Sequence, residues 1–217
     1  MRKSSKIVLA LIILTFIIGI YFYSHFPDQV ASHWNTKGEV DGYMSKFWGL
    51  FIAPFIMLGM WILFILIPKM DPLKENIEKF RKYYDSFIVI LTLFLFYIFL
   101  LVVIWNGIVE FNMTQAIVPA IAILFYYIGG LMSHMKRNWF IGIRTPWTLS
   151  NDKVWEKTHS IGGKLFKAIA VIIIIGLFFP NQLIWFVLVP VIASVIYLFV
   201  YSYFEYKRVS KDKNLIK

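Results

Sequence analysis

Side chains able to bind an acidic group gather in the stretch NWFIGIRTPWTLSNDKVW, residues 138–155. Arg144 precedes a Thr-Pro pair, and its planar guanidinium can hold a carboxylate or a phosphate through two hydrogen bonds. Asp152 or Glu156 can supply that carboxylate across the loop, which would make Arg144 an internal brace. A lipid headgroup or a partner protein can supply it instead, and the sequence leaves both interpretations open.

Three tryptophans recur in this region at intervals of eight residues, at Trp139, Trp147 and Trp155. Indole rings favour the headgroup region of a membrane, so the spacing predicts a segment that lies on or dips into the membrane surface. Trp155 and His159 are four residues apart and share one helix face, where they either contact a partner or anchor the segment.

Local signals predict how these side chains are positioned. Pro146 disfavours helix just before it, which predicts an extended or turned piece over residues 142–146. Ser150 or Asn151 is a good N-cap, and a short helix should run from there to Gly162 and Gly163.

A second polar segment, SHFPDQVASHWNTKGEVDGYMSKF, covers residues 24–47. Its proline and glycines predict turns, its aromatic residues predict interfacial anchors, and together they indicate a compact lid over the bundle. His33 is expected to fix the loop through a hydrogen bond. The spacing of the histidines and carboxylates here fits no recognised metal site.

Catalytic chemistry finds little support. The chain has no cysteine, no nucleophile beside a base, no glycine-rich phosphate loop and no His-Glu metal pair. We therefore predict no catalytic residues, no cofactor and no metal. The alternative of an interfacial membrane enzyme rests on two pairs that lack a third orienting group, His33 with Asp41 and His159 with Glu156.

The composition indicates that these segments are positioned by a membrane protein. Of 217 residues, 59% are hydrophobic, 19% aromatic and only 16% charged. A bilayer core about 30 Å thick needs roughly 20 apolar helical residues. Six segments meet or approach that length and predict an all-α, six-helix transmembrane bundle: 7–23, 48–68, 87–105, 115–133, 165–179 and 183–204.

The basic residues predict the topology. With the N-terminus inside, every Lys and Arg among the 22 falls on a cytoplasmic flank except Lys37 and Lys46. Both ends are then cytoplasmic, and the charge of +10 needs no nucleic-acid partner. The predicted organisation is two helices enclosing lid 24–47 (1–68), helices three and four (69–133), a cytoplasmic loop (134–164), and a final hairpin with a basic tail (165–217).

The two polar segments resemble a known family. IGIRTPWTLSNDKVWEKTH, residues 141–159, closely resembles the signature of the SdpI family of bacterial membrane proteins, G-[IL]-R-T-P-W-T-L followed by V-W. The residues on that pattern are Gly142, Arg144, Thr145, Pro146, Trp147, Thr148, Leu149 and Trp155. The lid is similar to the small N-terminal domain that often accompanies the family, through Pro27, His33, Asn35, Gly38, Asp41 and Gly42.

The resemblance implies a protein of the bacterial cell membrane that gives immunity to a secreted, membrane-active peptide toxin. It also implies signalling, in which a cytosolic transcriptional repressor is held at the membrane. We take the residues of the two motifs, with His159 inside and Trp34 outside, as candidate partner-binding residues.

A solute or peptide transporter is the main alternative function. Pro54, Pro119 and Pro190 interrupt predicted spans, as occurs around midplane binding sites. Against this, the centres of the spans hold no acidic, basic or histidine side chain, and such residues usually mark an ion-coupled pathway.

Overall fold

The computed structural model describes residues 2–214, and the last three residues of the predicted basic tail lie outside this range. Six of its helices are long and apolar enough to cross a membrane, which confirms the predicted fold class. They are α1 (Lys3–Tyr23), α2 (Lys46–Met70), α4 (Arg81–Gly107), α5 (Met113–Met132), α7 (Asp152–Gly176) and α8 (Leu183–Asn214). Three short pieces join them: α3 (Lys74–Lys79), α6 (Pro146–Ser150) and the 3-10 turn η1 (Pro180–Gln182).

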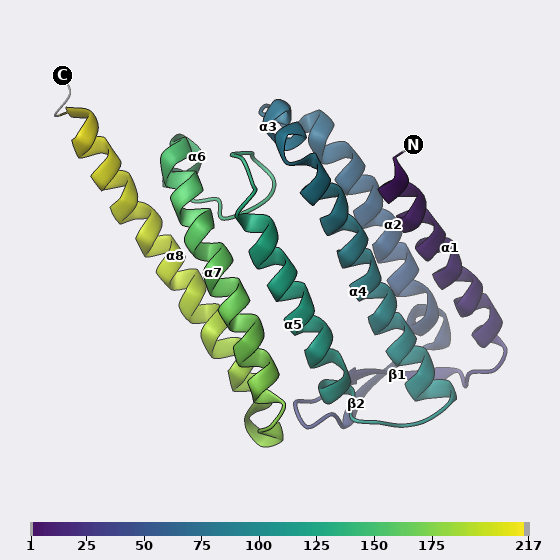
Figure 1. Ribbon diagram of the computed structural model, residues 1–217. Coiled ribbons are helices and arrows are strands. Elements are labelled where there is room, and N and C mark those ends of the chain that lie inside the picture. Colours follow the sequence, from purple (N-terminus) through teal and green to yellow (C-terminus); the bar gives the residue numbers. More distant parts are fainter. Residues whose placement is uncertain (1, 215–217) are drawn as a thin grey trace.

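The helices form two groups, one of α1, α2 and α4 and one of α5, α7 and α8, which meet where α4 contacts α5 (Figure 1). Both ends of the described chain lie on one face, together with α3 and α6 (Figure 1). The strands lie on the opposite face. The prediction that the first face is cytoplasmic remains a prediction.

Three buried hydroxyls inside the first helix group are paired, as a lipid-embedded bundle favours. The Tyr84 hydroxyl, on a side chain only 1% exposed, donates to the Phe64 carbonyl oxygen at 2.7 Å. Thr15 and Thr92 each donate a hydroxyl to the carbonyl oxygen four residues earlier, at 2.7 Å. These bonds let hydroxyls sit in a core that is otherwise apolar.

The sequence prediction was wrong about the fifth span. A short surface helix ending at Gly162 and Gly163 was expected, with a separate span beginning near residue 165, but α7 is one continuous helix. The glycines remain helical because α5 approaches them closely: a Cβ on Gly163 would lie 2.6 Å from the Gly129 carbonyl oxygen. Small residues at a helix contact mark close packing in membranes, and here they do not mark a helix end.

The lid forms a β-hairpin; the sequence predicted turns and a compact lid here, but no strands. Strand β1 (Gln29–Trp34) pairs antiparallel with β2 (Val40–Ser45). The Asn106 side chain at the end of α4 accepts from the Ala31 amide at 2.8 Å and donates to the Ala31 carbonyl at 3.0 Å. A helix-borne amide thus pairs with backbone groups of β1 and fixes the hairpin to the bundle.

Candidate partner-binding loop and lid

The Thr-Pro-Trp-Thr part of the internal loop (134–164) builds a helix start. Thr145 caps α6 by accepting from the Thr148 amide at 3.2 Å, and the Thr148 hydroxyl accepts from the Thr145 amide at 2.9 Å. Pro146 occupies the first turn, where a missing amide costs nothing. The Thr145 hydroxyl also donates to the Ser202 hydroxyl of α8 at 3.0 Å. These residues therefore shape the loop.

Trp147 and Leu149 attach α6 to the bundle. The Trp147 ring makes edge contacts with Phe199 and Tyr203 of α8, both at 5.1 Å between centroids. Leu149 packs against the main apolar core. The partly buried positions of both side chains make them anchors of this short helix.

His159 holds the turn before α6. Its Nδ1 donates to the Trp155 carbonyl oxygen at 2.8 Å, and its Nε2 accepts from the Ile143 amide at 3.0 Å. Only a neutral imidazole can make both bonds. Gly142 has φ +110°, and a Cβ there would overlap Nε2 of the ring. Glycine is therefore required both by backbone conformation and by the close histidine.

Trp155 is not an interfacial anchor, and the eight-residue tryptophan pattern was wrong on this point. The side chain is 1% exposed, stacks on His159 at 4.0 Å between centroids, and donates its indole N–H to the Met135 carbonyl oxygen at 3.0 Å. Trp139, by contrast, is 50% exposed. Burial of Trp155 follows from its position on the face of α7 that packs into the core.

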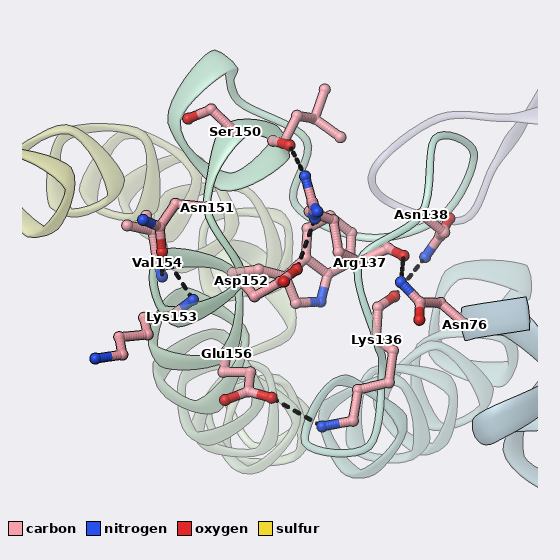
Figure 2. Close-up of polar contacts among 12 residues, drawn as sticks. Asn76, Lys136, Arg137, Asn138, Ser150, Asn151, Asp152, Lys153, Val154 and Glu156 are labelled. Atoms are coloured by element: carbon pink, nitrogen blue, oxygen red, sulfur yellow. Dashed lines mark hydrogen bonds and ion pairs between the residues drawn. The ribbon is translucent and has the colours of Figure 1, made fainter. Parts of the chain in front are cut away.

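The predicted brace through Arg144 is also wrong, because other cations occupy both carboxylates. Arg137 Nε lies 2.6 Å from Asp152 Oδ1, and Lys136 Nζ lies 2.8 Å from Glu156 Oε1 (Figure 2). Arg137 also donates to the Leu149 carbonyl oxygen at 2.7 Å. Because Glu156 faces Lys136, the pair of Glu156 with His159 considered for catalysis does not form.

Arg144 is left exposed at the surface. Its Nη1 donates to the Trp139 carbonyl oxygen at 2.6 Å, and among the described residues the guanidinium makes no ion pair. The remaining guanidinium donors are therefore available. Arg144 and Trp139 form a surface that we call the Arg–Trp face.

Two further polar residues position this loop, and the sequence argument missed both. Asn138 is fully buried; its side chain donates to the Lys136 and Ile141 carbonyls and accepts from two backbone amides. Asp71, 2% exposed, accepts from the Leu73 and Trp139 amides at 2.7 and 2.9 Å. Asp71 immediately precedes Pro72 at the end of α2, a turn signal that could have drawn attention to it.

In the lid, the turn between the strands is built by Asn35. Its side-chain oxygen accepts from the Lys37 and Glu39 amides at 2.9 and 3.1 Å, and Gly38 adopts φ +83° within the turn. The Thr114 hydroxyl of α5 donates to the Asn35 carbonyl oxygen at 3.2 Å. The turn is thus fixed both internally and against the bundle.

The other lid residues divide between packing and exposure. His33 Nδ1 is hydrogen-bonded to Asp41, and both side chains are largely exposed. Trp34 packs edge-on against Trp105 at 5.5 Å between centroids. Gly42 lies beside the Cβ of His33, where a side chain would collide. Pro27 is exposed in the link from α1 to the lid.

A polar cavity of about 390 Å³ lies beneath the lid turn and was not predicted. Three segments far apart in sequence line it, so no local pattern could reveal it. The lining residues are Thr36 and Lys37 of the lid, Asn112, Thr114 and Gln115 at the start of α5, Pro180 and Asn181 of η1, and Leu183 at the start of α8.

No group of three or more histidine, aspartate or glutamate side chains that could hold a metal occurs within the described part of the chain. The His33–Asp41 pair provides two such groups. The lid is a hairpin held by backbone and side-chain hydrogen bonds.

Comparison with known proteins finds one family model that matches the lid and another that matches the internal loop. Residues 134–202 match the SdpI/YfhL protein family, and residues 10–58 match a domain of unknown function, DUF1648. The chain is 24% identical over 213 residues to the immunity protein SdpI of Bacillus subtilis (strain 168), covering 97% of this chain and 100% of that protein. No solved structure matches. The family resemblance predicted from the two motifs is confirmed.

Proposed function

The chain belongs to the SdpI/YfhL family of multi-pass bacterial membrane proteins, and from this premise we propose that it protects a cell from a secreted, membrane-active peptide. We further propose that it signals the peptide's presence by holding a cytosolic transcriptional repressor at the membrane. The observation that carries the proposal is similarity to an immunity protein along 97% of the chain. That similarity spans both the lid and the internal loop.

The lid and the cavity beneath it are the proposed contact for the peptide. The cavity, at about 390 Å³, has the size of a small-ligand site, so it suits one end or one side chain of a peptide. Lys37 lines it and makes no ion pair among the described residues, which suits a carboxylate. The exposed His33 and Asp41 lie on the same hairpin.

The Arg–Trp face is the proposed contact for the repressor. Arginine and tryptophan are enriched among the residues that dominate protein interfaces. Arg144 has donors free for a carboxylate, and Trp139 exposes half of its surface beside it. The rest of the motif holds this face in place, because its hydrogen bonds end within the protein.

Protection can be tested by expressing the chain in a sensitive bacterium and adding a panel of membrane-depolarising peptides. We expect cells to keep their membrane potential, read with a voltage-sensitive dye, against at least one peptide. Lys37→Ala should weaken that protection, whereas Lys46→Ala, a second lid lysine that pairs with Asp28 at 3.0 Å, should not. Depolarisation by every peptide, with the protein present in the membrane, would refute immunity.

Signalling can be tested separately with a fluorescent fusion of any transcriptional repressor that is encoded beside the gene. Peptide should bring the fusion to the membrane. Arg144→Ala should abolish recruitment while protection persists, and Arg208→Ala, which removes an exposed arginine from α8, should change neither. Normal recruitment by Arg144→Ala would remove the Arg–Trp face from the proposal.

A further inference from the structure

We propose that an anionic phospholipid binds along α4, with its headgroup at the first turns of α1 and α4 and one acyl chain between α4 and α5. Two adjoining cavities carry this inference, and Ile90 lines both. One is rich in charge and the other is apolar. The site goes beyond the proposed function, because it involves neither the lid nor the Arg–Trp face.

The headgroup cavity has a volume of about 640 Å³ and an excess of positive charge. Asp85, its one acidic lining residue, is paired with Arg81 at 2.9 Å and with Arg2 at 3.4 Å. Lys3 and Lys82 also line it, are exposed, and make no ion pair among the described residues. Two uncompensated ammonium groups therefore face the space where a phosphate would lie.

The chain cavity, of about 530 Å³, is lined by α4 and α5. Of the three tyrosines in its lining, two have hydroxyls paired with backbone oxygens: the Tyr97 hydroxyl donates to the Ala116 carbonyl at 2.9 Å, and the Tyr127 hydroxyl donates to the Tyr83 carbonyl at 3.5 Å. The third, Tyr126, is 58% exposed. The remaining lining is apolar and includes Leu93 and Ile123. An acyl chain fits such a wall because nearly all of the lining surface is apolar.

A lipid is favoured over a transmembrane peptide as the occupant. A helix with its side chains is about 10–12 Å in diameter, whereas a cavity of about 530 Å³ has the size of a small-ligand site. The basic cavity begins at the helix ends, with Arg2 and Lys82, and meets the apolar one further along α4, at Ile90. The order of charge and apolar surface along α4 thus follows the order of groups in the lipid.

The test uses native mass spectrometry of the full-length protein in detergent, with phosphatidylglycerol and phosphatidylcholine of identical chains. Phosphatidylglycerol should bind more tightly. The double variant Lys3→Gln/Lys82→Gln should weaken its binding by on the order of 25-fold, about fivefold per lysine, and leave phosphatidylcholine unchanged. The matched control Lys207→Gln/Arg208→Gln removes the same charge from exposed positions on α8 and should have little effect.

A second variant tests the chain position. Ala120→Phe fills the cavity between α4 and α5 and should weaken both lipids, whereas Ala193→Phe, at an exposed position on α8, should weaken neither. Equal effects of the two charge variants, or no effect of Ala120→Phe, would overturn the site. Displacement of a bound lipid by a synthetic polyleucine-alanine helix would assign the surface to a peptide instead. None of these outcomes alters the immunity or recruitment tests, which use other residues.

Discussion

Replacing His159 with alanine tests whether the imidazole holds the turn that precedes α6. The ring accepts from the Ile143 amide at 3.0 Å and stacks on Trp155 at 4.0 Å between centroids. Alanine removes the acceptor and the stacked ring together. The Ile143 amide then has no partner unless water enters the site.

The expected effect follows from the two lost interactions. An amide left without its acceptor in a buried setting costs about 1–3 kcal/mol. Loss of aromatic stacking adds about 0.5–1.5 kcal/mol. Because Ile143 is only partly buried, the lower end applies, and we expect local opening to become easier by about 2 kcal/mol, or roughly 30-fold.

Hydrogen exchange of the Ile143 amide, measured by mass spectrometry on protein in nanodiscs, reports the free energy of this local opening. His159→Ala should speed exchange in the peptide containing Ile143 by roughly 30-fold. The control is His134→Ala, which removes an exposed histidine that stacks on Tyr83 at 3.8 Å. Exchange that is equally slow in His159→Ala and the unaltered protein would show that the imidazole does not hold this turn.

Three further perturbations test the architecture. Gly163→Ala should destabilise the protein by about 1–3 kcal/mol in thermal unfolding, because its Cβ collides with α5, whereas Gly130→Ala, which meets open space, should be neutral or stabilising. Asn106→Ala should speed hydrogen exchange of the β1 amides and leave α7 unchanged, since only the lid loses a partner. An impermeant thiol reagent should label Thr36→Cys but not Ser150→Cys in intact cells; the reverse pattern would invert the predicted orientation.

The six-helix bundle was predictable because bilayer thickness imposes a length and polarity on each span. The wrong prediction of a helix end at Gly162 and Gly163 comes from how the helices pack against one another in the membrane. A glycine pair often signals a helix end in water, but here a Cβ on Gly163 would lie 2.6 Å from the Gly129 carbonyl oxygen of α5, so the close approach of α5 requires glycine at that position. That contact joins residues more than 30 positions apart, and local patterns do not report it.

The pairing of charges was less predictable than the helices. The sequence offered Asp152 or Glu156 as a partner for Arg144, but Arg137 pairs with Asp152 and Lys136 pairs with Glu156 instead. The choice depends on the turn fixed by Asn138, whose four side-chain hydrogen bonds bend the chain between those two cations and Arg144. A single buried amide thus determines which basic residues face α7.

This exchange of partners changes what mutations in the motif can reveal. Thr145, Thr148 and His159 direct their polar atoms into the protein, so their replacement alters the shape of the loop before it alters any contact with a partner. Arg144 is the charged residue on the signature pattern, and it keeps unpaired donors at the surface. A signalling defect in Arg144→Ala with unchanged thermal stability would therefore indicate a lost contact, whereas the same defect in Thr148→Ala would be expected from loss of the α6 cap alone.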